Sequence, residues 1–229
     1  MDNLKQQQLD GFNITAPYKE KIIPYLDEMD AYAEKIGAVN TVLCKDGQWI
    51  GYNTDGIGYV RALESKYPYI TATKDKSILI LGAGGATKGI YQALIENDYD
   101  NITIANRTIE KAQTLTQHHA TSKAITREEA ENNSIEYDII INTSSVGMKP
   151  NIHEVIISLK QLKKDVIVSD IVYQPLMTQL LHDAKELGAN IHFGHTMLLY
   201  QAQYAYEIWT DLHPNMDQLD DALQQVLEG

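Results

Sequence analysis

Two side chains of opposite charge follow predicted strand ends, and together they could carry acid-base chemistry. Lys19 lies in "GFNITAPYKEK", where an apolar run meets a threonine and a proline that mark the end of a strand. Asp55 lies in "YNTDG", at the end of a later strand, and Asn40 in "GAVNT" is either a turn residue or a partner for a hydroxyl group. A lysine held by a carboxylate can give a proton to an oxygen and take it back. The simpler interpretations are a solvated lysine and an aspartate that caps a turn or helix.

A glycine-rich turn, "LILGAGGATKG", points to a bound dinucleotide. Gly82, Gly84 and Gly85 follow an apolar strand and precede a helix. In that setting glycines allow a tight turn and bring backbone N–H groups and a helix N-terminus close to a pyrophosphate. The match to G-x-G-x-x-G is imperfect, because Thr87 takes the last position and Gly89 comes two residues later. A turn without a ligand is the alternative, and the strand-turn-helix setting favours the dinucleotide.

The end of the next strand indicates which dinucleotide fits. An NAD site places Asp or Glu there, where it accepts hydrogen bonds from the ribose hydroxyls. Here the strand ends on Asn106, Arg107 and Thr108, and Lys111 follows one turn later. Cationic and neutral hydrogen-bonding groups suit a 2′-phosphate, so the pattern favours NADP(H). The alternative is a helix start that Thr108 caps, with exposed basic residues around it.

A cofactor of this kind carries out the hydride chemistry itself. The protein must then supply an acid-base group at the alcohol oxygen. Lys19, positioned by Asp55, is the residue that we expect to fill this role.

The first third of the chain must position this lysine. A strand is predicted at "GFNIT", and apolar residues at helical spacing predict a helix over residues 18–37 that ends at Gly37. Asp46-Gly47 between two β-rich runs predicts a hairpin, and residues 56–67 resume helical periodicity. The polar, proline-led segment from Pro68 to Lys76 is the expected domain boundary. The first ten residues resemble the end of a helix.

The rest of the chain alternates strands with helices. Apolar strands are predicted in "SILIL", "NITIA", "YDIIIN", "DVIVSD" and "NIHF", with helices between them. Strands that are apolar on both faces and alternate with helices form a parallel sheet with right-handed crossovers. The last segment is helical. We therefore predict an α/β protein with a substrate domain at 1–70, a dinucleotide domain at 76–196 and packing helices at 197–229.

Composition and charge restrict the possible partners. The net charge of −12 opposes binding to nucleic acid or to an anionic membrane surface, but not a local basic pocket. A single cysteine, Cys44, allows no disulfide within the chain and is expected to be a small buried residue. No HExxH or zinc-type spacing, signal peptide or membrane-spanning run is recognised, so no metal and a cytoplasmic location are expected. A monomer and a homodimer both remain possible.

The order of motifs resembles one family, the shikimate dehydrogenases. The resemblance rests on "GFNITAPYKE", "GAVNT", "GYNTDGIG", "LGAGGATKG", "ANRT", "INTSSVGM", "SDIVY" and "LLYQAQYAYEIW", and it extends from Gly11 to about Trp209. It implies a Rossmann domain for NADP joined to a smaller α/β substrate domain. It also implies reversible NADPH-dependent reduction of 3-dehydroshikimate to shikimate, in the pathway to chorismate and the aromatic amino acids.

The resemblance also implies roles for individual residues. Lys19 would be the acid-base group and Asp55 its partner. The residues implied in substrate binding are Thr15, Asn40, Thr54, Tyr173 and Gln201. The residues implied in cofactor binding are Gly82, Ala83, Gly84, Gly85, Ala86, Asn106, Arg107, Thr108, Lys111, Ile171 and Gly194. Without the family, Tyr173 would be read as a core tyrosine and Gln201 as an ordinary helix amide.

One part of the family pattern is not found. Family members begin with a β-α-β stretch whose Ser-x-Ser-x-Ser-Pro motif binds the substrate carboxylate, and no such motif precedes Gly11. The substrate domain is therefore expected to be truncated, with NADP(H) binding retained and turnover low. Two alternatives stay open: an NAD-dependent quinate/shikimate dehydrogenase, which the carboxylate-free strand end disfavours, and a catalytically impaired NADP-binding fragment.

Overall fold

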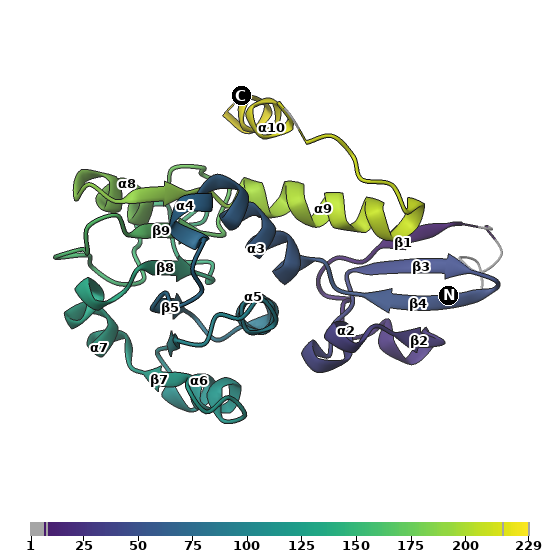
Figure 1. Cartoon of the computed structure of the whole chain (residues 1–229), viewed down its shortest axis with the longest axis horizontal. Coiled ribbons are helices and arrows are strands. Elements are labelled where there is room, and N and C mark those ends of the chain that lie inside the picture. Colours follow the sequence, from purple (N-terminus) through teal and green to yellow (C-terminus); the bar gives the residue numbers. More distant parts are fainter. Residues whose placement is uncertain (1–6, 8, 217, 229) are drawn as a thin grey trace.

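The protein contains two β-sheets joined by long helices, as seen in a computed structural model (Figure 1). The structure describes residues 7, 9–216 and 218–228. The first sheet is built from residues 11–52 and the second from residues 78–192. Helices α3 (Asp55–Lys66) and α9 (His195–Thr210) pack on each other between the sheets. The α/β class expected from the sequence is confirmed.

The first sheet has four strands in the order β1-β3-β4-β2. They are β1 (Gly11–Asn13), β3 (Thr41–Lys45), β4 (Gln48–Tyr52) and β2 (Glu28–Met29). The expected hairpin joins β3 to β4, with positive φ angles of 52° at Asp46 and 79° at Gly47. Val42 in β3 and Trp49 in β4 are buried on one face of the sheet. Cys44 is half-buried rather than buried, and it packs at the margin of the cluster that contains Val42 and Trp49.

The prediction of a single helix over residues 18–37 is wrong. The chain forms a short 3₁₀ helix η1 (Ile23–Tyr25), the strand β2 and a helix α2 (Ala31–Ile36). Pro24 at the start of η1 cannot donate a backbone hydrogen bond within a longer helix. The next residues pair with β4 instead, since Asp27 N donates to Trp49 O at 2.9 Å. The predicted helix end is correct, because Gly37 terminates α2 in the left-handed conformation.

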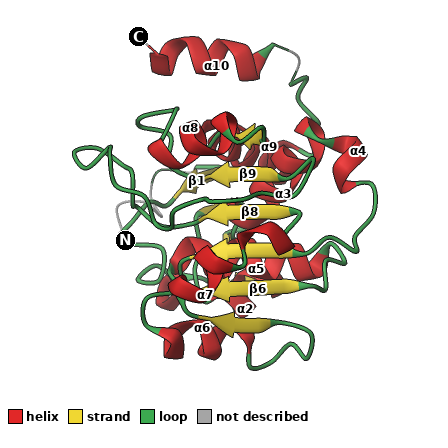
Figure 2. Ribbon diagram, turned by 90° about the vertical axis from the view of Figure 1, so that its left-hand side faces the viewer, coloured by secondary structure: helices red, strands yellow, loops and turns green. Residues whose placement is uncertain are grey.

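The second sheet has six parallel strands in the order β10-β9-β8-β5-β6-β7, with helices on its faces (Figure 2). The strands are β5 (Ile78–Leu81), β6 (Ile102–Ala105), β7 (Lys123–Ile125), β8 (Ile139–Asn142), β9 (Ile167–Asp170) and β10 (Asn190–His192). The helices after them are α5 (Gly85–Glu96), α6 (Ile109–Thr116), α7 (Arg127–Asn132), η2 (Ser134–Glu136) and α8 (Gln179–Glu186). Counted from β5, this is the strand order of a Rossmann fold.

The sequence predicted five strands in this sheet and missed the sixth, β7. This edge strand has only three residues, and all are at least partly exposed. The four strands β5, β6, β8 and β9 are buried at every position and therefore read as continuous apolar runs. A short edge strand gives no such signal. Helix α7, which follows β7, was missed with it.

The last helices connect the two sheets. The indole N–H of Trp209 in α9 donates to Val42 O in β3 at 2.9 Å. The joint after α3 forms a short helix α4 (Pro68–Thr71), and the chain ends in α10 (Leu219–Glu228), which packs on α9. The helix expected in residues 1–10 lies mostly outside the described residues. Among the described residues, no helix is long and apolar enough to span a membrane.

Candidate active site

Lys19 and Asp55 meet, as their positions after two strands of the first sheet suggest. Lys19 Nζ lies 2.5 Å from Asp55 Oδ2. Asp55 is the first residue of α3 and follows β4, whereas Lys19 lies in the segment after β1. The backbone carbonyl of Lys19 accepts a hydrogen bond from Val39 N at 2.8 Å, which ties this segment to the residue before Asn40. The pair is therefore built from elements that are distant in sequence.

An amide network surrounds the carboxylate of Asp55. Asn40 Nδ2 donates to Asp55 Oδ1 at 2.9 Å, and Asn40 Oδ1 accepts from Thr54 N at 2.8 Å. Thr54 Oγ1 reaches Gln201 Oε1 at 3.3 Å, so the network extends from the first sheet to α9. Asn40 and Thr54 are buried. Because each polar atom of Asn40 has a partner, its orientation is fixed, and the network fixes Asp55 in turn.

The Lys19–Asp55 pair opens on a cleft of about 480 Å³, which we call the pair cleft. Its walls come from the segments around the first sheet and from residues 171–201, which follow β9 and continue into α9. Predicted residues that line it are Thr15, Lys19, Asn40, Asp55, Ile171, Tyr173, Gly194 and Gln201. Thr54 lies behind this wall, bonded to Asn40 and Gln201. Tyr173 is 41% exposed and so is not the core tyrosine that its type alone suggested.

The glycine-rich turn between β5 and α5 faces open space. Gly82 has a φ of +119°, a conformation that side chains with a Cβ rarely adopt. A Cβ built at Gly84 or Gly85 would meet no other atom within 4 Å. Thr87 Oγ1 accepts from Gly84 N at 3.0 Å and contacts Thr143 Oγ1 at 2.7 Å, which ties the turn to β8. The turn is thus held in place, and a phosphate group of a ligand has room to approach its backbone N–H groups.

A second cleft of about 340 Å³, the basic cleft, lies at the carboxyl ends of β5, β6 and β8. Its lining residues are Gly82, Ala83, Gly84, Asn106, Arg107, Thr108, Lys111, Arg127, Thr143, Ser144 and Ser145. Three of them are cationic and none is a carboxylate, although the whole protein carries a net charge of −12. Gly85 and Ala86 begin α5 and do not line the cleft. This cleft therefore fits a ligand with a concentrated negative charge.

Known proteins share this architecture. Family models described as "Shikimate dehydrogenase substrate binding domain", "Shikimate / quinate 5-dehydrogenase" and "Shikimate 5'-dehydrogenase C-terminal domain" match residues 1–42, 65–175 and 194–224. The shikimate dehydrogenase (NADP(+)) of Oceanobacillus iheyensis is 50% identical over 226 residues, which is 99% of this chain and 81% of that relative. The chain belongs to the shikimate dehydrogenase family.

Solved structures of the family carry different cofactors. The shikimate 5-dehydrogenase of Thermus thermophilus, in complex with NADP(H) and shikimate, is 30% identical with a TM-score of 0.84, covering 98% of this chain and 82% of that one. The quinate dehydrogenase of Corynebacterium glutamicum, in complex with NAD, is 29% identical with a TM-score of 0.86, covering 99% and 80%. Because the fold is common to both, the choice of dinucleotide must lie in individual side chains.

This shikimate dehydrogenase family member has cleft residues that sequence reasoning did not single out. In the pair cleft they are Asn13, Ile14, Met197 and Leu198. In the basic cleft they are Arg127, Thr143, Ser144 and Ser145. The motif "INTSSVGM" contains the last three, so a residue-by-residue reading of that motif would have found them. Arg127 belongs to no motif and follows the strand that the sequence did not reveal.

A buried carboxylate, Asp170, ties together the loops after β8 and β9. It accepts hydrogen bonds from Asn142 Nδ2 at 3.0 Å, Val172 N at 2.9 Å and Thr178 Oγ1 at 2.8 Å. Burial raises the pKa of the Asp170 carboxyl to about 6, and the hydrogen bonds offset part of this effect. The loop after β9 carries Ile171 and Tyr173, so Asp170 supports one wall of the pair cleft.

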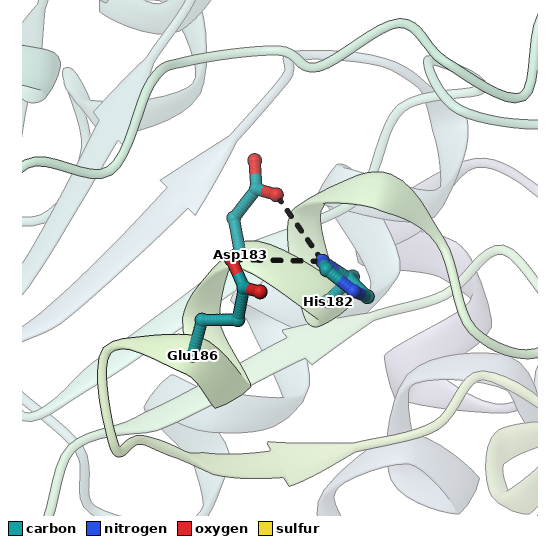
Figure 3. A group of neighbouring side chains, drawn as sticks. All are labelled: His182, Asp183 and Glu186. Atoms are coloured by element: carbon teal, nitrogen blue, oxygen red, sulfur yellow. Dashed lines mark ion pairs between the residues drawn. The ribbon is translucent and has the colours of Figure 1, made fainter.

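One group of described side chains could offer three ligand atoms to a metal ion. His182, Asp183 and Glu186 lie together on α8, with ligand atoms within 4.8 Å of one another (Figure 3). His182 Nδ1 lies 3.6 Å from Asp183 Oδ1, which also accepts from Gln179 Nε2 at 2.7 Å. The histidine and the glutamate are exposed, and the group shares no residue with either cleft. We assign it no metal.

Proposed function

We propose that the chain catalyses the reversible, NADPH-dependent reduction of 3-dehydroshikimate to shikimate, a step on the way to chorismate and the aromatic amino acids. The observation that carries this proposal is the Lys19–Asp55 pair, which opens on a cleft between the two sheets. The cofactor supplies the hydride. The protein has to hold the two reactants together and to move one proton at the reacting oxygen.

Lys19 moves that proton. During reduction its ammonium group gives a proton to the carbonyl oxygen as the carbon receives the hydride, and the carbonyl becomes an alcohol. During oxidation the lysine amine takes the proton of the alcohol back. Asp55 keeps Nζ in place from one side, and its own carboxylate is held by Asn40. Proton transfer by a positioned side chain typically accelerates such a reaction by about 10² to 10⁴.

The substrate binds in the pair cleft. Its hydroxyl groups find partners in the amide and hydroxyl groups of the network described above. We assign substrate contacts to Thr15, Asn40, Tyr173 and Gln201, which line the cleft. Thr54, which the family resemblance also implies in substrate binding, is buried behind them and acts by holding Gln201 through a hydrogen bond. Polar groups that converge on one cleft can select a polyhydroxylated ring, since each hydroxyl of such a ring then finds a hydrogen-bond partner.

NADP(H) binds along the carboxyl edge of the second sheet. The turn has open space for the pyrophosphate at Gly84 and Gly85, Gly82 provides its positive φ, and Ala86 continues it into α5. The residues that would hold the 2′-phosphate are Asn106, Arg107, Thr108 and Lys111, all of which line the basic cleft. Ile171 and Gly194, on the wall of the pair cleft, would lie next to the nicotinamide. The absence of a carboxylate from the lining of the basic cleft favours NADP(H) over NAD(H).

The test follows the absorbance of NADPH in mixtures of the protein with shikimate and NADP⁺. Parallel mixtures replace NADP⁺ by NAD⁺, or shikimate by quinate. A rise that requires shikimate and is fastest with NADP⁺ supports the proposal. A faster rate with NAD⁺ and quinate would identify a quinate dehydrogenase instead, and no rise with any pair would overturn the proposed activity.

Three further assignments belong to the same proposal. The substrate domain comprises residues 1–70, the cofactor domain residues 76–196, and residues 197–229 supply helices that pack across both. The enzyme acts in the cytoplasm as a monomer or a homodimer. Limited proteolysis tests the domain division, because cleavage should concentrate in the joint between residues 70 and 76. Sedimentation of the purified chain measures its oligomeric state.

A further inference from the structure

Arg127 is a third cation of the basic cleft, and no motif predicts it. It is the first residue of α7 and directly follows Thr126, the N-cap of that helix. Its neighbours in the cleft include Arg107 and Lys111, which come from the loop after β6 and from α6. Three positively charged side chains thus converge from two successive crossovers of the Rossmann sheet. Like charges this close oppose one another unless an anion lies between them.

The side chain of Arg127 has unsatisfied hydrogen-bonding capacity. Its Nε atom is buried and has no hydrogen-bond partner among the residues that the structure describes. Burial and the nearby charge of Arg107 both lower the pKa of Arg127. A buried donor of a charged group costs free energy until it is paired. The position is therefore unfavourable in the protein alone and becomes favourable when a ligand brings acceptor oxygens.

Two of the three carboxylates on α7, those of Glu129 and Glu131, are engaged away from Arg127. Glu129 Oε2 accepts from Thr126 N at 2.7 Å and from Thr126 Oγ1 at 2.8 Å, which completes a capping box. Glu131 lies 3.3 Å from Lys160 Nζ and accepts from Ser158 N at 3.0 Å. These interactions hold both acids in place along α7. Arg127 itself lines the basic cleft, whose lining residues are all neutral or cationic.

We propose that Arg127 determines cofactor specificity by binding the 2′-phosphate of NADP(H) together with Arg107 and Lys111. This inference rests on the proposed function and adds a residue to it. The guanidinium presents parallel N–H groups that match two phosphate oxygens, which a lysine cannot reproduce. NAD(H) lacks this phosphate, so Arg127 contributes to the binding of one cofactor and not of the other.

The test compares the affinity for both cofactors in three variants. Arg127→Ala removes the cation, Arg127→Lys keeps the charge without the planar group, and Lys123→Ala removes an exposed cation of β7 that does not line the cleft. Titration calorimetry gives the dissociation constants for NADP⁺, NAD⁺ and 2′,5′-ADP. We expect Arg127→Ala to raise the dissociation constants for NADP⁺ and 2′,5′-ADP by about 10- to 100-fold. The dissociation constant for NAD⁺ should change less than twofold. The dissociation constant of Arg127→Lys for NADP⁺ should lie between those of Arg127→Ala and the unmodified chain. Lys123→Ala should bind NADP⁺ as tightly as the unmodified chain does.

Each other outcome has a defined meaning. An equal loss for NADP⁺ and NAD⁺ would show that Arg127 contacts the adenine or supports the fold, and it would overturn the inference. Unchanged NADP⁺ affinity in Arg127→Ala would overturn it while leaving the proposed function intact, provided that the unmodified chain prefers NADP⁺. If the unmodified chain binds no NADP⁺, both proposals fail. Circular dichroism of each variant checks that a loss of cofactor affinity does not come from a loss of folded structure.

Discussion

Lys19 Nζ lies 2.5 Å from Asp55 Oδ2, although the two residues are separated by 36 positions in the sequence. Their side chains are 31% and 23% exposed, so water screens the pair and its contribution to stability is small. The pair is better explained by position than by stability. It fixes a proton carrier at the wall of a cleft that is large enough for a small ring and the end of a dinucleotide.

Replacing Lys19 by alanine tests this explanation. We expect kcat for shikimate oxidation to fall by about 10² to 10⁴, because the proton then has no positioned acceptor. The dissociation constant for NADP⁺ should stay within twofold, since Lys19 does not line the basic cleft. The matched control is Lys21→Ala, which removes an exposed lysine near the Tyr18 ring. Normal turnover in Lys19→Ala would refute the assigned role.

A carboxylate introduced at the end of β6 should change the choice of cofactor. Asn106 lines the basic cleft, and its Nδ2 donates to Thr108 O at 2.8 Å. In Asn106→Asp the new charge repels a 2′-phosphate and can accept hydrogen bonds from the ribose hydroxyls of NAD⁺. We expect the ratio of kcat/KM for NADP⁺ over NAD⁺ to fall by at least about tenfold. An unchanged ratio would place the 2′-phosphate elsewhere.

Short sequence motifs correctly predicted two tight turns of the fold. Asp46-Gly47 predicted the hairpin, and the glycine-rich turn marked the passage from an apolar strand to a helix that β5 and α5 form. Both signals depend on backbone geometry that only a few residue types tolerate. Such geometry is encoded within a few residues, and therefore it can be read without knowing the rest of the fold.

Features that depend on tertiary contacts were not predictable in this way. Residues 18–37 have helical periodicity, yet Asp27 and Asp30 pair with β4, which the periodicity does not encode. Strand β7 is too short and too exposed to give a pattern, and Arg127 was missed because it follows this strand. Gln201 is a further residue whose place in the site depends on a tertiary contact. Its position in α9 marks it as a site residue only through contact with Thr54, 147 residues earlier.

The close packing of α3 on α9 gives a stability prediction at Gly58. A Cβ at this position would lie 2.5 Å from the backbone N of Gln201, which cannot move without moving α9. Alanine gains about 1 kcal/mol of helix propensity over glycine, but the overlap outweighs this gain. We expect Gly58→Ala to lower the free energy of unfolding by about 1–3 kcal/mol in urea titrations.

A matched glycine in α5 provides the control for Gly58. At Gly89 the nearest atom to an added Cβ is Tyr32 Oη at 3.7 Å, an ordinary contact. Gly89→Ala should therefore leave the stability unchanged or raise it slightly. Gly58→Ala should also raise KM for shikimate, because displacement of α9 moves Gln201. Equal effects of the two substitutions on stability would show that the helices can separate without cost.

Asp170 should make the stability of the protein depend on pH. Burial raises its pKa to about 6, compared with about 3.9 in an unfolded chain. Between these values the native state binds a proton that the unfolded state has released. The stability contributed by the protonated carboxyl is thus complete below pH ~4 and is lost as the pH rises through 6. His192, whose pKa burial lowers to about 3, acts in the opposite direction over an overlapping range.

The variant Asp170→Asn isolates the aspartate, because His192 contributes equally to both proteins. Its amide oxygen can still accept hydrogen bonds from Asn142 and Val172, but it cannot ionise. We expect the free energy of unfolding of the variant, minus that of the unmodified chain, to increase between pH 4.5 and 7 by about 2 kcal/mol. Urea titrations at half-unit pH intervals measure this difference. A difference that does not change with pH would mean that Asp170 ionises as readily in the folded chain as in the unfolded one, and that the loops after β8 and β9 are held around a charged group.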